Sequence, residues 1–486
     1  MKVAGVIAEF DPFHNGHAFF LRRVREVTSA DFIIAVMSGD FTQRGNIAIG
    51  GKRLRTEAAL LNGADIVIEL PVQYATASAE TFATGGISIL KALNCVDAIC
   101  FGTEEEDIKA LKSVARIFEN ESGEFKENIS DCIKEGMSYP KARLEAAVRN
   151  SGAAGKGLSG DRIAEILCQP NNILAIEYIK AVSKLWNKRE VAENVRDKAV
   201  DIKCDKVDIK QDKINVKCKE VDINQEKVNI NKEKVNINQK RTDIHAKQGL
   251  TPELVNIKRQ SVDHDSVNTY GIYSSAKNIR NTLERTNSPE TVAGFMPDNT
   301  KRLMEEHFGI DYPTFNRDLS SLLRYRLIME EADSLMKYAD MSAELARRIE
   351  KHKNDYIDIS QFTELIKTRN LTYTRISRAL LHVLLSIKKD SMKEYAEYGY
   401  TGYARVLGFK KGASELIRFM NEKANVPVIT RCAEYKGKLK HPFKEMYEED
   451  LKASLIRDLI VKEIYDTDLT GDLARITVTK DDMILG

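Results

Sequence analysis

Residues 5–17, near the start of the chain, constrain the fold more than any other stretch. A short apolar run is broken by Phe10-Asp11-Pro12-Phe13, and an amphipathic segment, residues 18–27, follows directly after Gly16-His17. Apolar runs of this length form buried strands, and the amphipathic spacing is typical of a helix. The order predicts a strand, a tight loop and a helix that begins at the carboxyl edge of the strand.

Two histidines, His14 and His17, flank a glycine at the start of this predicted helix. A helix N-terminus offers unpaired N–H groups and a positive dipole end to phosphates, and imidazole N–H groups stabilise charge that develops on a phosphate. Gly16 would let a nucleotide approach the backbone. Simple helix capping by the histidines is the weaker interpretation, because the complete order resembles the H-x-G-H signature of the nucleotidyltransferase superfamily. That superfamily includes the class I aminoacyl-tRNA synthetases, and the resemblance implies adenylate chemistry.

Apolar runs of strand length alternate with helical segments through the first hundred residues. After the first strand, the sequence predicts strands at 31–37, 65–70 and 96–101, with helices at 53–61 and 78–93. Strands that are apolar on both faces and alternate with helices indicate a parallel sheet covered on both sides. We therefore predict a doubly wound α/β domain, whose ligands bind beyond the carboxyl ends of the strands.

Polar residues near these strand ends are further candidates for the site. Gln43, Arg44 and Lys52 could meet a triphosphate or a carboxylate, although a solvated surface loop explains them equally well. Gly102 at a strand end permits close approach of a base or ribose. Asn171 introduces a helix and could cap that helix, contact a nucleotide, or do both.

A second anion-binding motif is predicted past residue 270. Ser274 and Ser275 precede a helix, and Arg280 follows about one and a half turns later. Hydroxyl and N–H groups at the cap, with a guanidinium from the helix, form an anion cradle. An isolated pair of serines would favour a plain N-cap, but this stretch resembles the second superfamily signature, Ser-Ser-x-x-x-Ile-Arg. The two motifs support each other.

Residues 197–250 differ from the rest of the chain. Short apolar pairs such as Val228-Asn229-Ile230 and Val235-Asn236-Ile237 recur every seven residues between lysine-rich polar segments. Apolar residues at i and i+2 cannot form one helical seam, so a coiled coil is disfavoured. We expect a disordered, dispensable insertion with too little apolar surface to offset its ordering entropy. A basic arm for RNA is the less favoured alternative, because Asp and Glu cancel most of the lysines.

The last part of the chain, residues 296–486, is expected to be mostly helical. Cations cluster here with tyrosines between them, which suits contacts with the phosphates and exposed bases of a folded RNA. Charged surface helices are common, so composition alone does not establish RNA binding. The predicted tRNA contacts are Lys367, Arg369, Arg375, Arg378, Lys410 and Lys411.

Bulk composition narrows the class of protein. Lys and Arg number 74 against 72 Asp and Glu, so net charge does not by itself indicate a nucleic-acid binder. The seven cysteines form no C-x-x-C pair, which predicts reduced thiols and no protein-held metal. The first strand begins without a signal peptide and no apolar run reaches membrane-spanning length, so we expect a cytoplasmic protein that does not enter a membrane.

Several motifs occur in one order along the chain, and together they resemble the bacterial tRNA(Met) cytidine acetate ligases. The resemblance covers nearly the whole chain except the repeat insertion. It implies a catalytic domain made of residues 1–196 and 251–295, followed by a tRNA-binding region at 296–486. Besides residues 5–17, the motifs are Met37-Ser38-Gly39-Asp40-Phe41-Thr42-Gln43-Arg44-Gly45, Ile68-Glu69-Leu70-Pro71, Cys100-Phe101-Gly102-Thr103-Glu104, Pro170-Asn171-Asn172-Ile173-Leu174 and Arg405-Val406-Leu407-Gly408-Phe409.

This resemblance implies an enzyme that makes acetyl-adenylate from acetate and ATP. The acetyl group would then pass to N4 of the wobble cytidine of elongator tRNA(Met), with Mg²⁺ accompanying the pyrophosphate. His14, His17 and Arg280 are the expected catalytic residues, and no residue stands out as a general base for acetyl transfer. The expected ATP contacts are Ile7, Ala8, Glu9, Phe10, Asp11, Pro12, Phe13, His14, Asn15, Gly16, His17, Ala18, Phe19, Phe20, Gly102, Asn171, Arg259, Ser274 and Ser275.

Two other functions stay open from the sequence. A small-molecule nucleotidyltransferase would use the helical third for oligomerisation, and a homo-oligomer is compatible with either reading. A non-catalytic RNA-binding protein would keep a vestigial ATP site. The cation clusters after residue 366 argue against the first alternative, and the intact histidine and serine motifs argue against the second.

Overall fold

The computed structural model describes residues 1–119, 123–137, 139–150, 158–186, 251–259, 271–469 and 477–479. By its internal contacts the chain divides into two compact units, one made of residues 1–182 and 252–486, the other of residues 183–251. The predicted insertion, residues 197–250, lies outside the described residues, so its disorder and its alternative role as an RNA arm stay predictions.

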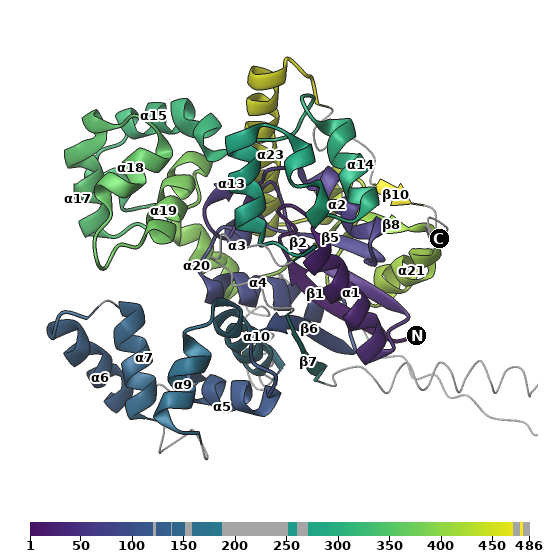
Figure 1. The fold of residues 1–486 in the computed structure, drawn as a ribbon, viewed down its shortest axis with the longest axis horizontal. Helices are drawn as coiled ribbons and strands as arrows, with labels where there is room; N and C mark the ends of the chain where they lie inside the picture. Colours follow the sequence, from purple (N-terminus) through teal and green to yellow (C-terminus); the bar gives the residue numbers. More distant parts are fainter. Residues whose placement is uncertain are drawn as a thin grey trace, which may run out of the picture. The chain divides into compact units, whose positions relative to one another are not determined.

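A mixed sheet forms the centre of the first unit (Figure 1). Strands β1, β2, β5, β6 and β7 are parallel to one another, as the alternation of apolar strands and helices predicts. The strand order is β10 (Thr477–Thr479), β8 (Ala404–Lys410), β5 (Ile66–Leu70), β2 (Phe32–Ser38), β1 (Val3–Ala8), β6 (Ala98–Thr103) and β7 (Glu253–Lys258), with β9 (Val428–Ile429) paired to β8.

Helices cover both faces of the sheet, because successive side chains of a buried strand point to opposite sides. Ala4 and Val6 of β1 belong to a core cluster with Leu21 of α1 (Asn15–Thr28) and Leu54 of α2 (Lys52–Leu61). On the other face, a Cβ on Gly5 would lie 2.8 Å from Leu90 of α4 (Ala79–Ala92). The doubly wound α/β prediction is confirmed.

The helical parts of the chain form two further groups in Figure 1. One follows β6 and consists of α5 (Ile108–Glu119), α6 (Gly123–Lys134), α7 (Tyr139–Arg149), α9 (Gly160–Leu167) and α10 (Pro170–Trp186). The other is built on a second hydrophobic cluster around α15 (Ser320–Met329), α17 (Ala343–His352), α18 (Ile359–Ile366) and α19 (Tyr373–Leu385). The remaining helices are α3 (Val72–Ala75), α13 (Ala276–Thr286), α14 (Asp298–His307), α16 (Ala332–Leu335), α20 (Lys389–Glu397), α21 (Ser414–Lys423), α22 (Tyr435–Lys438) and α23 (Phe443–Tyr465).

None of the helices in the described ranges combines the length and apolar composition that a membrane span needs.

The predicted boundary at residue 296 does not separate the sheet from the helical region. Strand β8, far beyond that boundary, pairs antiparallel with β5, with Val67 opposite Gly408. Without β8, the fully buried run Ile66–Leu70 would be an unprotected sheet edge. A Cβ on Gly408 would lie 2.7 Å from the Thr56 side chain of α2, so the glycine allows β8 to pack closely. The sheet is therefore completed by the last third of the chain.

A buried cluster of charges joins α23 and β8 to the N-terminal strands. Lys52 Nζ lies 2.8 Å from Glu69 Oε1 and donates to Ser454 Oγ at 2.7 Å. Glu69 Oε2 lies 2.9 Å from Arg405 Nη1, and Ser454 donates to Asp40 at 3.0 Å. Each of these five side chains is at least nine-tenths buried. Lys52 therefore lies in a buried charge cluster and not on a solvated surface loop.

Replacing Lys52 with methionine should lower the free energy of unfolding by about 3–5 kcal/mol, because Glu69 and Asp40 would keep buried charges without their partner. Urea unfolding followed by circular dichroism would measure the loss. Lys301→Met is the matched control, since Lys301 makes a half-exposed pair with Glu305 at 3.9 Å and should change stability by less than about 1 kcal/mol. Equal losses in the two variants would contradict a stabilising role for the cluster.

Candidate active site

The predicted strand, loop and helix are present at the carboxyl edge of the sheet. His14 is the N-cap of α1, and its Nδ1 accepts the N–H of Gly16 at 3.0 Å. His17 Nδ1 accepts the N–H of His14 at 3.3 Å, and the two rings stack with centroids 3.8 Å apart. Because both Nδ1 atoms accept, these bonds assign the proton of each neutral ring to Nε2. Capping uses one nitrogen of each ring, and the other is an N–H donor.

A contact within the protein explains why residue 16 is a glycine, and the sequence did not reveal this contact. A Cβ at this position would lie 2.8 Å from Cε1 and 3.0 Å from Nδ1 of His14. Since His14 is only 4% exposed, its ring has little room to retreat. The absence of a side chain at Gly16 therefore leaves room for the His14 ring. Its role in admitting a nucleotide stays a prediction.

Arg55 of α2 holds the main chain around this loop. Its guanidinium donates to the carbonyl oxygens of Glu9 at 2.7 Å, Ser38 at 3.0 Å and Gly50 at 2.8 Å, and also to that of Gly39. Burial lowers the pKa of Arg55, partly offset by Asp11 and Asp40. Sequence reasoning missed this residue. Its spacing was a signal, because Arg55 precedes Ala58 and Ala59 by three and four residues and so lies on the same apolar face of the helix.

Phe10 follows Glu9 with φ of +50°, in the left-handed region that bulky residues rarely adopt. Its ring is buried against Phe13 and His17, with centroids 4.9 and 5.0 Å away. Side-chain packing and the hydrogen bond from Arg55 to Glu9 therefore stabilise a backbone conformation of Phe10 that is unfavourable by itself.

The second predicted motif packs against the first. Ser275 caps α13 by accepting the N–H of Asn278 at 3.1 Å, and Ser274 accepts from the Asn278 side chain at 2.9 Å. Arg280 donates to the carbonyl oxygen of Asp11 at 2.5 Å and lies 3.3 Å from its carboxylate. Asn15 also donates to the carbonyl oxygen of Ile272 at 2.9 Å. The structure thus brings the two motifs together, with Arg280 bound to the loop.

Gly102, Asn171 and Arg259 also come together, beside β6 and β7. Arg259 Nη1 donates to Asn171 Oδ1 at 2.7 Å, and a Cβ on Gly102 would lie 3.3 Å from Arg259. The Asn171 amide donates to Glu104, whose charge partly offsets the burial that lowers the pKa of Arg259. Helix α10 begins at Pro170 and the Asn171 side chain bonds to Glu104 and Arg259, so the helix-capping role considered for Asn171 is not observed.

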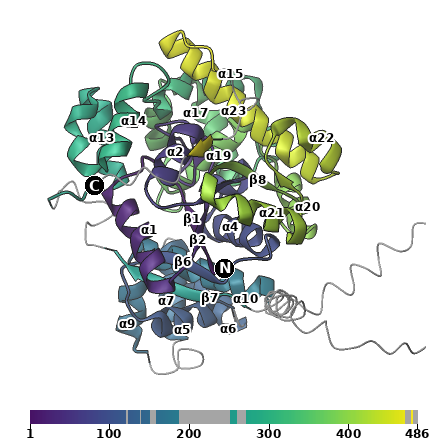
Figure 2. The same cartoon turned by 90° about the vertical axis from the view of Figure 1, so that its right-hand side faces the viewer.

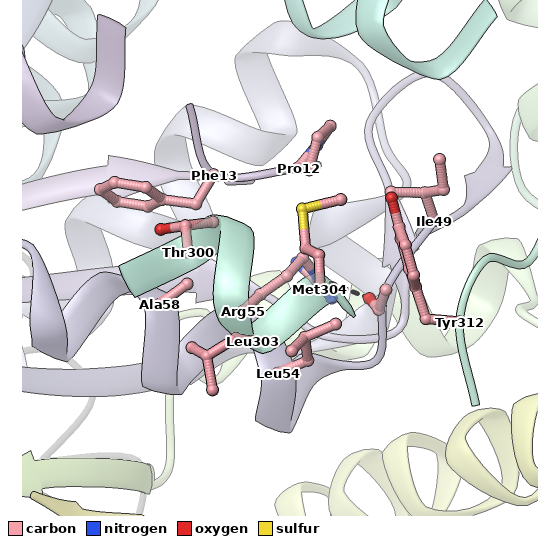
Figure 3. A pocket seen from close by; sticks show the side chains of 11 residues that line it. Pro12, Phe13, Ile49, Leu54, Arg55, Ala58, Thr300, Leu303, Met304 and Tyr312 are labelled. Atoms are coloured by element: carbon pink, nitrogen blue, oxygen red, sulfur yellow. Dashed lines mark hydrogen bonds between the residues drawn. The ribbon is translucent and has the colours of Figure 1, made fainter. Parts of the chain in front are cut away.

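A small apolar pocket lies behind the loop, between α2 and α14 (Figure 3). Leu303 and Met304 of α14 face Leu54 and Arg55 of α2 across it. Its full lining is Pro12, Phe13, Ile49, Gly50, Leu54, Arg55, Ala58, Thr300, Leu303, Met304 and Tyr312. This apolar wall supports the loop from the side of α14.

Comparison with known proteins places this site in a family. The family model described as HIGH Nucleotidyl Transferase matches residues 1–203 and 243–471. The tRNA(Met) cytidine acetate ligases of Thermoanaerobacter sp. (strain X514) and Clostridium kluyveri are each 31% identical, covering 95% and 96% of this chain and 96% of their own lengths. The chain belongs to the tRNA(Met) cytidine acetate ligase family. It is accordingly a ligase, as its motifs predict.

Solved structures of the family agree with this fold. Thermotoga maritima TmcAL in its apo form superposes with a TM-score of 0.80 at 26% identity, covering 99% of this chain and all of that one. The same protein bound with alpha-thio ATP gives a TM-score of 0.78. The family model leaves out residues 204–242, which lie within the predicted insertion.

The predicted tRNA contacts do not form one group. Lys410 and Lys411 lie at the end of β8, near α21. The other four lie on or beside α18 and α19. Figure 1 shows these two helices on the other side of the sheet. Arg378 is mostly buried, with Nε 2.6 Å from Asp340. Lys367 and Arg369 are exposed, and Lys367 pairs with Glu364 at 3.1 Å. Arg378 is thus held inside the helical region, and Lys367 and Arg369 are the better candidates.

The histidine geometry predicts a spectroscopic result. In ¹H–¹⁵N spectra of histidine-labelled protein, His14 and His17 should both show the Nε2–H tautomer when their rings are neutral. Gly16→Ala should displace the His14 ring and remove this signature from His14. Gly437→Ala is the control, since a Cβ there meets nothing within 4 Å. An unchanged His14 signal in Gly16→Ala would contradict the proposed role of this glycine.

Proposed function

We propose that this chain activates acetate with ATP to give acetyl-adenylate and transfers the acetyl group to N4 of the wobble cytidine of elongator tRNA(Met). The observation that carries the proposal is the pair of stacked histidines at the N-terminus of α1, each with its Nε2–H as a donor. Relatives named tRNA(Met) cytidine acetate ligase, and a solved TmcAL that binds alpha-thio ATP, support it.

In this proposal the triphosphate of ATP lies over the first turn of α1. The positive end of the α1 dipole and the Nε2–H groups of His14 and His17 stabilise the charge on the phosphates. Gly102, Asn171 and Arg259 lie beside the nucleoside, where the absent Cβ of Gly102 leaves room. Ser274, Ser275 and Arg280 close the other side, with Arg280 fixing the loop through Asp11.

The first half-reaction is in-line attack by an acetate oxygen on the α-phosphorus of ATP. A P–O bond to acetate forms, the bond to pyrophosphate breaks, and the histidines bind the charge that develops. Within the described ranges, no group of three His, Cys, Asp or Glu side chains is arranged to hold a metal. Mg²⁺ would therefore enter bound to the phosphates of ATP and keep several waters.

The second half-reaction brings the anticodon of the tRNA to the acetyl-adenylate. Exposed cations such as Lys367 and Arg369 beside α18 would bind tRNA phosphates and set the position of the anticodon. Phosphate contacts of this kind supply affinity that depends on salt, while the site selects the reacting base.

Acetate-dependent exchange of labelled pyrophosphate into ATP tests the first half-reaction. We expect exchange with the intact protein and a loss of at least about 100-fold in His17→Ala, since removing one transition-state donor typically costs that much. The variant His352→Ala should show normal exchange. This histidine lies at the end of α17 and pairs with Asp355. Folded protein that binds ATP but shows no acetate-dependent exchange, with or without tRNA(Met), would overturn the proposal.

Charge reversal of Lys367 and Arg369 tests the tRNA surface. The double variant Lys367→Glu/Arg369→Glu should raise the KM for tRNA about tenfold or more and make binding less dependent on salt. Lys393→Glu on α20 is the control, because Lys393 is also an exposed lysine on a helix of this region and pairs at 3.8 Å with Glu397. A KM for tRNA that is unchanged in the double variant would move the tRNA site elsewhere on the protein.

A further inference from the structure

Carboxylates gather at the carboxyl edge of the sheet, and most of them have both oxygens engaged. Asp11 accepts the N–H of Ile49 at 2.7 Å with one oxygen and faces Arg280 with the other. Asp40 accepts from the N–H of Lys52 and from Ser454, and Glu69 is bound by Lys52 and Arg405. Glu104 accepts from Asn171 and from the N–H of Asn172. Each of these groups is held in place by the protein itself.

Glu9 is different. Its Oε1 accepts the N–H of Gln43 at 2.6 Å, and Oε2 has no hydrogen-bond partner among the described residues. The side chain is partly exposed, whereas Asp11, Asp40 and Glu69 are at least nine-tenths buried. Arg55 fixes the Glu9 carbonyl oxygen at 2.7 Å. The carboxylate is thus anchored through its main chain and one oxygen, with the second oxygen available to a ligand.

The surroundings of Glu9 determine its proton affinity. Burial raises the pKa of Glu9, the Gln43 N–H lowers it, Asp11 raises it, and Arg280 and Arg44 lower it. From other elements, Arg55 of α2 interacts electrostatically with this carboxylate. Glu9 in turn adds to the burial that raises the pKa of the Tyr178 phenol on α10. A carboxylate in such a setting accepts a proton more readily than one in water.

The histidines beside Glu9 are unsuited to accept a proton. Both Nδ1 atoms already accept main-chain N–H groups, and both Nε2 atoms carry the ring protons. They are donors suited to phosphate oxygens. Glu9 directly follows β1, in the same loop as His14, and its second oxygen can accept a proton. A carboxylate repels a triphosphate but accepts a hydrogen bond from the exocyclic amine of cytosine.

We propose that Glu9 binds the exocyclic amine of the acceptor cytosine and takes up its proton during acetyl transfer. This inference rests on the proposed function. As the amine nitrogen attacks the acetyl carbonyl carbon, a C–N bond forms. The C–O bond to the phosphate then breaks, and AMP leaves with the electron pair. The proton from the amine goes to Glu9 Oε2 and afterwards to AMP or water, so atoms and charge balance.

Glu9→Gln tests this role, because it keeps the shape and removes the proton acceptor. Acetyl transfer to tRNA(Met) is measured in a single turnover from preformed acetyl-adenylate, alongside acetate-dependent pyrophosphate exchange. General-base catalysis contributes about 10²–10⁴-fold, so we expect the ratio of transfer to exchange to fall at least about 100-fold. Glu106→Gln is the matched control, since this exposed carboxylate pairs with Lys258 on the surface. Its ratio should equal that of the intact protein.

The pH dependence of transfer gives a second readout, which begins with the intact protein. With intact protein, the transfer rate should rise with pH as Glu9 loses its proton and then reach a plateau. Glu9→Asp, which keeps a carboxylate, should retain the rise at a lower rate, and Glu9→Gln should lose it. A rate that falls with pH would make Glu9 a proton donor and overturn the proposal.

Three further outcomes separate this inference from the proposed function. Intact protein without acetate-dependent exchange would refute the function itself. Normal exchange in Glu9→Gln together with undiminished transfer would refute the inference alone. A parallel fall of exchange and transfer in that variant would also overturn it, because Glu9 would then act in adenylate formation.

Discussion

The geometry of the site depends on the guanidinium of Arg55, buried inside the protein. It binds carbonyl oxygens at the ends of β1 and β2 and at the loop before α2. Three chain segments that would otherwise carry unpaired buried carbonyl groups are thereby joined at one point. One of these segments contains Glu9. The contact with its carbonyl oxygen therefore helps to position the residues that follow, the left-handed turn at Phe10 and the cap at His14.

The same edge of the sheet is completed by residues far along the chain. Arg280 from α13 binds Asp11, while Ser454 from α23 and Arg405 from β8 close the buried charges around Glu69. Figure 2, turned from the first view, shows α13 beside α14, with the sheet strands β1 and β2 below. The catalytic region and the helical region thus share a core at this edge, and neither has an independent boundary at residue 296.

Hydrogen bonds from main-chain N–H groups determine which of the neighbouring side chains remain as donors and which remains as an acceptor. The helix cap makes His14 and His17 donors through Nε2, which suits a phosphate group in the first half-reaction. The Gln43 N–H binds one oxygen of Glu9 and leaves an acceptor, which suits an amine in the second. In the proposed mechanism, residues 9–14 between β1 and α1, together with His17 in the first turn of α1, serve two half-reactions with opposite electrostatic needs.

Sequence alone determined the strands and helices of the doubly wound domain and the two signature motifs, because apolar periodicity and short-range spacing are local properties. It did not reveal that β8 pairs with β5, that Lys52 is buried, or that Arg378 faces Asp340. Those facts depend on contacts between residues tens to hundreds of positions apart, for which one sequence carries no periodic signal. Tertiary structure alone decided which polar side chains are bound within the protein and which, like Glu9, keep an oxygen available, because burial and partners are fixed only when distant segments pack.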